Sequence, residues 1–285
     1  DSKEKREKYK AHVARMLQFL GTKPDKAKQE AESILAFETS MSKPRLDRVE
    51  RRDRRKTYNP KAISELSALT PSIKWNEYLS GLGITGVDTI IVSQPKYMEA
   101  LQAIFKENKV EDWKNYMRWT LLNGAADGLT TEIEKANWEF YSKTLNGALK
   151  QRPRNENALQ DVNGAIGEAL GKLYVEKMFP AEAKKKAENM INNIIKAYGI
   201  RIKNLTWMDE KTKESAIEKL DRIRIKIGYP DTWKDYSALV IKSPEEGGTA
   251  FENGMNITKW NFKKNIDDLK KPVNKDEWFM SPQTV

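Results

Sequence analysis

The chain has 285 residues, of which 39% are hydrophobic and 32% are charged, and it carries a net charge of +10 with a single His and no Cys. This length and apolar content suffice for a sizeable core and exclude an intrinsically disordered chain. The lack of Cys excludes a disulfide scaffold and a thiolate metal site. No uncharged apolar run approaches the ~18 residues that a membrane span needs.

Apolar residues recur at helical spacing from the start of the chain. In the first predicted helix, over 3–20, His12 lies outside the apolar stripe, on the side that leans toward solvent, and Gly21 ends the helix. The apolar stripe itself consists of Tyr9, Val13, Met16, Leu17 and Leu20. Pro24 can occupy the first turn of the second helix.

The same periodicity continues to the C-terminal part of the chain. Asn59-Pro60 is typical of a cap and first turn for a helix that carries Ile63 and Leu66. Residues 89–93, TIIVS, are the best candidate for a strand, or for an extended link. Further helices are predicted over 24–41, 75–79, 95–107, 110–126, 131–146, 157–178, 181–203, 206–228 and 250–269. The pattern therefore predicts an all-α, multi-helix lobe with at most short strands.

The densest basic stretch is KPRLDRVERRDRRK, residues 43–56. Its acids fall three residues apart, so at helical spacing they can pair with arginines such as Arg51 and Arg54. No aromatic residue interleaves with these arginines, so the stretch offers no stacking platform for bases. We expect a solvated or interdomain helix here and no nucleic-acid partner.

Catalytic motifs are mostly absent. A zinc-protease helix needs two His residues four positions apart with a Glu between them, and His12 alone cannot supply that. The glycines of GLGITG lack the strand-turn-helix context and the lysine of a phosphate-binding loop. We therefore assign no catalytic, cofactor-binding or metal-binding residue to this chain.

Three composite motifs give a more specific indication. They are GKLYVEKMF around Tyr174, LTWMDEKT around Trp207, and GYPD at Gly228. Together with VERRDRRKTYNP, DWKNYMRWTLL and the C-terminal KKPVNKDEWFMSPQTV, they resemble the neprilysin family of zinc metallopeptidases, which includes neprilysin, endothelin-converting enzyme and the bacterial oligoendopeptidase O. The resemblance is collinear and covers nearly the whole chain.

The resemblance implies that residues 1–245 form a helical lobe covering a peptidase cleft. Residues 246–285 would then connect to a catalytic lobe that is absent from this chain. In the family the segment like DEWFMSPQTV runs into a substrate-binding strand, and the HExxH and ExxxD zinc motifs follow. The implied parent is a zinc endopeptidase for oligopeptides, and this chain alone would be inactive. We expect Trp278, Phe279 and Met280 to form bare apolar surface.

The motif residues also have a purely structural interpretation, and the function has an alternative. The large motif residues, among them Leu173, Tyr174, Phe179 and Trp207, are most simply core anchors, and the glycines at 164, 167 and 171 allow close approach of a partner element. The alternative function is a stand-alone helical interaction or scaffold protein. Animal family members are rich in Cys, so the absence of Cys favours a bacterial member, for which an extracytoplasmic location is favoured and the cytoplasm remains open.

Overall fold

The structure, a computed structural model, describes residues 2–284. Within that range it contains twelve α-helices, several short 3-10 or π turns, and one pairing of two short strands, which confirms the all-α prediction. The helices are α1 (Ser2–Phe19), α2 (Pro24–Ser42), α3 (Arg54–Thr57), α4 (Ile63–Leu69), α5 (Trp75–Gly81), α6 (Pro95–Glu107), α7 (Val110–Ala125), α8 (Thr131–Trp138), α9 (Arg154–Met178), α10 (Ala181–Lys203), α11 (Glu210–Asp221) and α12 (Ala250–Asp268). No helix within these residues is long and apolar enough to cross a bilayer.

The described chain divides into two compact units. Unit 1 comprises the residues up to Gln151 together with Lys242–Met255 and Phe262–Asp267. Unit 2 comprises Arg152–Ile241, Asn256–Asn261 and the residues from Asp268 onward. Residues of α12 therefore occur in both units.

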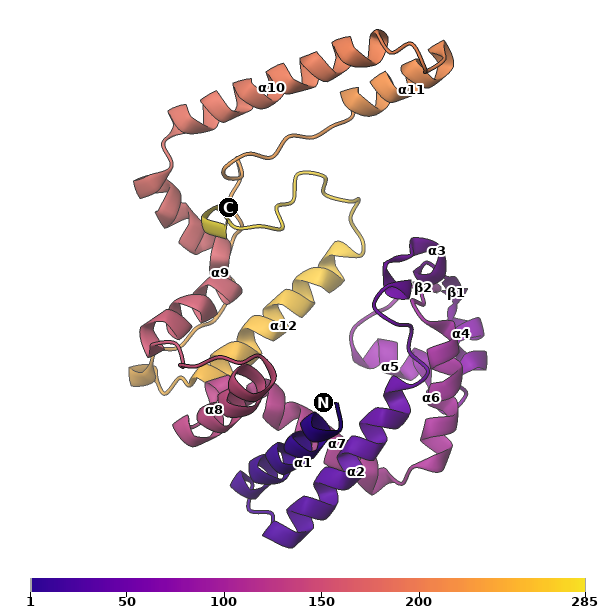
Figure 1. Cartoon of the computed structure of the whole chain (residues 1–285), viewed down its shortest axis with the longest axis vertical. Helices are drawn as coiled ribbons and strands as arrows, with labels where there is room; N and C mark the ends of the chain where they lie inside the picture. The colour runs from indigo at the N-terminus through magenta and orange to yellow at the C-terminus, as the bar shows by residue number, and fades with distance from the viewer. Residues whose placement is uncertain (1, 285) are drawn as a thin grey trace. The chain divides into compact units, whose positions relative to one another are not determined.

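Unit 1 holds the hydrophobic core. Its helices α1 and α2 lie side by side (Figure 1), and α7 and α8 pack against them. Trp119 of α7 is the largest fully buried side chain, with 1% of its surface exposed. The core around it is made of Val13, Ala14, Met16, Leu17, Ala27, Ala31, Ile34, Leu122, Ala126, Ile133 and Ala136. In the first predicted helix Val13, Met16 and Leu17 are buried as expected, Tyr9 is half-buried and Leu20 is exposed.

A chain of hydrogen bonds crosses this core. Trp119 Nε1 donates to Tyr9 Oη at 2.9 Å, and Tyr9 Oη donates to Glu38 Oε2 at 2.7 Å. Burial raises the pKa of Glu38, and burial with the bond to Glu38 raises the pKa of Tyr9. Because these three residues belong to α7, α1 and α2, the bonds fix the three helices in one register.

His12 is buried, with 6% of its surface exposed, so its predicted place on the solvent side of α1 is wrong. The π-helical turn Glu139–Leu145, which continues α8, covers that side of α1. The imidazole stacks on Phe140 with ring centroids 4.7 Å apart and meets Trp119 and Tyr141 edge-on. Periodicity within α1 could not reveal this second covering element, because it comes from more than a hundred residues away.

The strand prediction at 89–93 is confirmed as β2 (Thr89–Ile91), and its partner was not foreseen. Residues 60–62 form β1 (Pro60–Ala62) instead of a first helical turn, and Pro60 pairs with Ile91 in an antiparallel register. Proline is tolerated at the first residue of an edge strand because no ladder hydrogen bond from its nitrogen is needed there. Helix α4 consequently begins at Ile63.

The helix predicted over 206–228 is shorter than expected. Asp209 caps α11 by accepting a hydrogen bond from the Thr212 backbone nitrogen at 2.7 Å. The helix ends at Asp221, and Gly228 lies beyond an irregular stretch in a left-handed conformation with φ of +73°. The β-branched isoleucines of RIRIKIG disfavour continued helix, which explains the early end.

Unit 2 buries little apolar surface. Its helices α10 and α11 lie side by side (Figure 1). Apart from Pro230 and Pro282, none of the buried apolar side chains of the described chain belongs to this unit. Trp207 is 76% exposed, and Leu173 and Tyr174 are exposed as well, so the prediction that they are core anchors is wrong. Within the described residues, unit 2 therefore presents large apolar side chains to solvent.

A first prediction concerns the acid stability of unit 1. Burial, with a smaller effect of Arg15, lowers the pKa of His12 to about 4, whereas an unfolded His has a pKa of about 6.5. The fold therefore favours the neutral ring, whereas the unfolded chain binds a proton there below pH 6.5. The free energy of unfolding is unaffected by this group above pH 6.5 and decreases by roughly 3 kcal/mol as the pH falls from 6.5 through 4. We expect His12→Phe to reduce this acid-induced decrease in the free energy of unfolding.

The measurement is urea unfolding of the parent chain and of His12→Phe at several pH values between 7 and 4. The carboxylates are common to both chains, including Glu38, whose raised pKa acts in the opposite direction. Their contributions cancel in the difference between the two chains. Equal losses of stability on acidification in both chains would show that His12 is not the responsible group.

Candidate functional site

The described residues do not form a zinc site. None of their His, Asp and Glu side chains gather in a group of three that could hold a metal ion. His12 is enclosed by aromatic rings and its Nε2 has no hydrogen-bond partner. A catalytic zinc needs three protein ligands and an open position, and the described residues do not bring three such side chains together.

The family-like motifs meet instead in two packed junctions of unit 2. The first lies where the C-terminal 3-10 turn Pro282–Thr284 rests on α9. Pro282 is buried against Gly171, where an added Cβ would lie 2.5 Å from the proline Cδ. Gln283 Nε2 donates to the Gly167 carbonyl at 2.8 Å and to Asn163 Oδ1. The predicted close approach at Gly167 and Gly171 is thus made by the chain's own C-terminal segment.

Helix α9 is kinked at this junction. Ile166 has non-helical backbone angles, φ of −132° and ψ of 40°, next to Gly167. Gly167 also faces Ser281, whose Oγ would lie 3.3 Å from an added Cβ. Gly164 has no atom within 4 Å of such a Cβ, so only two of the three regularly spaced glycines serve the contact.

The second junction joins the LYVEKMF motif to GYPD at the corner between α9 and α10. Gly228 packs under Phe179, where an added Cβ would lie 2.5 Å from Phe179 Cε1. Tyr229 meets Phe179 edge-on with ring centroids 6.1 Å apart. Lys184 Nζ lies 4.3 Å from the centroid of the Tyr229 ring. The two motifs therefore contact each other in one aromatic cluster, although about fifty residues separate them in the sequence.

Lys184 completes this second junction. Its Nζ donates to the Tyr229 carbonyl at 2.9 Å and to Asp231 Oδ1 at 2.8 Å. Sequence reasoning did not single it out, because it is the first of three consecutive lysines and nothing in the local pattern distinguishes it. The same holds for Asn163, whose partner Gln283 lies 120 residues away. Both junctions hold segments of the backbone in place through these contacts.

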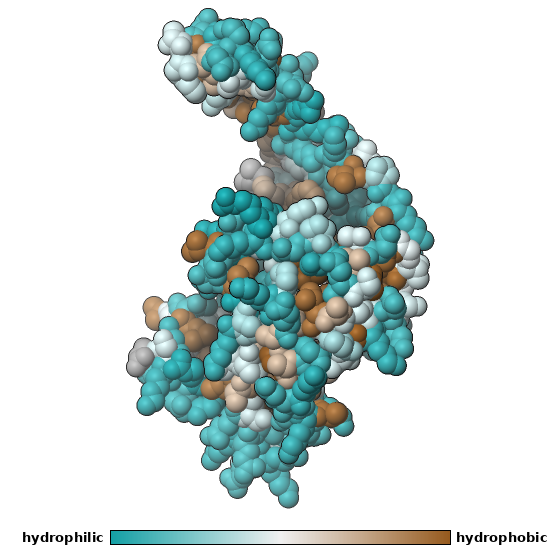
Figure 2. Space-filling model, turned by 90° about the vertical axis from the view of Figure 1, so that its right-hand side faces the viewer, coloured by the Kyte–Doolittle hydropathy of each residue, from teal (hydrophilic) through white to brown (hydrophobic). Residues whose placement is uncertain are grey.

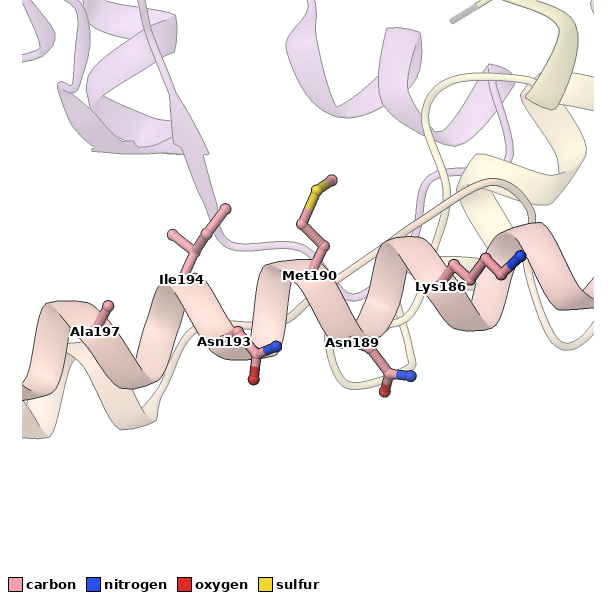
Figure 3. A pocket seen from close by; sticks show the side chains of 6 residues that line it. All are labelled: Lys186, Asn189, Met190, Asn193, Ile194 and Ala197. Carbon is pink, nitrogen blue, oxygen red and sulfur yellow. The ribbon is translucent and has the colours of Figure 1, made fainter.

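Two exposed apolar surfaces accompany the junctions. One is an open face of α10 that includes Met190, Ile194 and Ala197. Met190 and Ile194 project from one side of the helix and Asn189 and Asn193 from another (Figure 3). The second surface is at Phe279, which is 88% exposed, and Met280. The expected bare apolar surface is thus confirmed for these two residues, whereas Trp278 is half-buried.

A second prediction tests the contact between the C-terminal 3-10 turn and α9. Gly171→Ala places a methyl group against Pro282 and we expect it to destabilise the junction by about 1–2 kcal/mol, since overpacking outweighs the gain in helix propensity. Gly164→Ala is the matched control and should stabilise α9 by about 0.5–1 kcal/mol. Hydrogen exchange of residues 279–284 should accelerate only in Gly171→Ala. Unchanged protection there would contradict the proposed close contact.

A third prediction tests the contact between Phe179 and Gly228 in the second junction. Gly228→Ala introduces both a strained left-handed backbone and a clash with Phe179. Gly247 has nearly the same φ, +76°, and no neighbour within 4 Å, so Gly247→Ala carries the backbone cost alone, about 1 kcal/mol. We expect the loss of unfolding free energy in urea to be larger for Gly228→Ala by about 1–3 kcal/mol. Equal losses would show that the Phe179 contact does not constrain the turn.

Comparison with known proteins agrees with this geometry. The profile of peptidase family M13 matches residues 1–230. An endothelin-converting enzyme homolog of Locusta migratoria is 31% identical over 97% of this chain and 40% of its own length. A neutral endopeptidase of Lactobacillus helveticus is 28% identical over 93% of this chain and 40% of its own length. The chain thus spans about two fifths of the curated relatives it matches.

A solved structure shows the same fold. The Mycobacterium tuberculosis zinc metalloprotease Zmp1, in complex with an inhibitor, superposes with a TM-score of 0.86 at 32% identity, covering 99% of this chain and 42% of that protein. The profile match covers most of the chain, and the LYVEKMF motif and the start of GYPD lie within it. The chain therefore belongs to peptidase family M13, the family of the neprilysins and endothelin-converting enzymes, and corresponds to its N-terminal region.

Proposed function

We propose that this chain is the helical lobe of an M13 zinc endopeptidase that cleaves oligopeptides. In this proposal the lobe covers the catalytic cleft and admits only short peptides, and the HExxH lobe belongs to the part of the relatives' length that this chain does not span. Residues 1–245 form the covering lobe, and residues 246–285 lead to the catalytic lobe.

The family match carries the proposal. The chain aligns over almost its whole length with proteins named as endothelin-converting enzymes and as a zinc metalloprotease, and spans about 40% of each. The described residues contain no cluster of metal ligands, so any metal chemistry would lie outside them. In the proposed parent, a zinc ion would supply an activated water with a glutamate as general base.

The surface of unit 2 supports a lobe that packs against another part of the protein. The exposed large apolar residues include Met190, Ile194, Tyr198 and Ile200 on α10, Trp207 on the connection to α11, and Phe279 with Met280. Large exposed apolar patches mark interaction sites. We assign this surface, including Met190 and Ile194, to contact with the catalytic lobe or with the enclosed peptide.

The residues of the two junctions have a positioning role in this proposal. Gln283 and Pro282 hold the C-terminal segment on α9, and the Lys184–Tyr229 contacts fix the corner at which α10 begins. None of these residues performs a chemical step. They hold the C-terminal segment and the start of α10 in place on the helical lobe.

A fourth prediction tests whether zinc binding and catalysis belong to a part of the parent protein outside this chain. The 285-residue chain, mixed with equimolar zinc, should show no tight site in isothermal titration and should not cleave a quenched oligopeptide above a buffer blank. A longer polypeptide that continues through HExxH and ExxxD segments should gain zinc binding and cleavage together, and a chelator should abolish both. His12→Phe in the longer polypeptide is the matched control and should retain both properties.

Two results would contradict the proposal. Chelator-sensitive cleavage by the 285-residue chain would place the chemistry in this lobe. A gene that encodes no HExxH segment beyond residue 285 would instead favour the alternative, a helical scaffold protein without catalysis.

A further inference from the structure

Residues 46–59, here called the arginine loop, form a compact element of unit 1. The single helix expected within 43–56 is replaced by a 3-10 turn (Glu50–Arg52) and the one-turn helix α3. The loop is anchored at both ends: the Leu46 backbone nitrogen donates to Gln94 Oε1 at 2.8 Å, and Asn59 Nδ2 donates to the Val92 carbonyl at 3.0 Å. Its side chains are therefore presented on a fixed backbone.

The acidic side chains of the loop find their partners within the loop, but these partners are not Arg51 and Arg54, as helical spacing predicted. Asp53 binds Arg55 through both carboxylate oxygens at 3.0 Å. Glu50 Oε1 pairs with Lys56 Nζ at 2.8 Å. These partners lower the pKa of each carboxyl group.

Asp47, the third acid, is used by the backbone. Its Oδ1 accepts from the backbone nitrogens of Val49 and Glu50, each at 2.8 Å. All three carboxylates are thereby committed to the internal structure of the loop.

Four arginines remain without an acidic partner. In the part of the chain that the structure describes, no ion pair, hydrogen bond or ring contact engages the side chains of Arg48, Arg51, Arg52 and Arg54, and all four residues are exposed. Arg51 and Arg54 thus do not form the internal pairs that helical spacing predicted. The six basic and three acidic residues of the loop leave it a net charge of +3, with the four unpaired arginines lying within seven residues. This local positive charge favours binding of an anion.

Exposed apolar side chains lie among these charges. Val49 is 75% exposed and Tyr58 is 65% exposed, and both belong to the loop. Ile91 of β2 is also exposed, and it pairs with Pro60, the residue that directly follows the loop. The face of the molecule that includes this region is mainly hydrophilic with separate hydrophobic spots (Figure 2).

We propose that the arginine loop is a peripheral docking surface for an anionic phospholipid bilayer. Guanidinium groups bind phosphate through paired hydrogen bonds, and each basic residue near an anionic bilayer contributes about 1 kcal/mol. Val49 and Tyr58 suit the boundary between headgroups and acyl chains.

The same features fit nucleic acid less well. Tyr58 is the loop's single aromatic residue, so it offers no series of stacking platforms. The one-turn helix α3 is too short to read a major groove. The combination of unpaired arginines with exposed aliphatic and aromatic side chains therefore favours a lipid surface.

A fifth prediction tests this docking surface by vesicle co-sedimentation of the 285-residue chain. We expect binding to vesicles that contain phosphatidylglycerol and none to phosphatidylcholine alone. The quadruple variant Arg48→Ala, Arg51→Ala, Arg52→Ala, Arg54→Ala should weaken binding by at least about tenfold. Val49→Ser with Tyr58→Ser should reduce the binding that persists at high salt, because the insertion of apolar groups is not screened.

The matched control removes four charges elsewhere. Lys185, Lys196, Lys211 and Lys219 are exposed on unit 2, and their replacement by Ala lowers the net charge by the same amount. This control should retain vesicle binding, with circular dichroism verifying that both quadruple variants are folded. Equal weakening by the two quadruple variants would show that net charge alone acts. Binding of a DNA oligonucleotide without vesicle binding would assign the loop to nucleic acid. Either result overturns the proposal.

Discussion

The burial of Trp119 is the constraint on which unit 1 depends. Its indole is fully buried in the core that α1, α2 and α7 share, and its nitrogen donates to Tyr9, which in turn bonds to Glu38. An unpaired indole nitrogen in this core would cost about 1–3 kcal/mol. The helices therefore meet with Tyr9 and Glu38 at the same level, and His12 is enclosed beside them by Phe140 and Tyr141 of the π-helical turn.

Unit 2 is organised differently. Its specific contacts are close approaches at glycines, Pro282 on Gly171 and Phe179 on Gly228, rather than a buried apolar core. Such contacts define the path of the backbone and contribute little burial. A unit that fixes the course of its chain while leaving apolar side chains exposed is suited to packing against a further part of the protein, which agrees with the proposed role as a lobe of a larger peptidase.

The arginine loop shows how local structure decides the use of charge. Helical spacing distributes the three acids among the arginines, but the observed 3-10 and one-turn helices direct Asp47 to the backbone and leave Asp53 and Glu50 to Arg55 and Lys56. The composition of the stretch is the same in both arrangements. Only the observed one concentrates the unpaired charge at Arg48, Arg51, Arg52 and Arg54.

The sequence by itself determined the fold class, most helix positions, the short strand near 89–93 and the family, because periodicity and long composite motifs are local properties of the chain. The tertiary structure decided which side of α1 is covered, which residues pair with TIIVS, and which motif residues are packed. His12, Pro60, Trp207 and Lys184 illustrate the difference. The neighbours of His12, Pro60 and Lys184 are distant in sequence, and no element among the described residues covers Trp207. A periodic pattern states which side chains share a face but not what lies against that face.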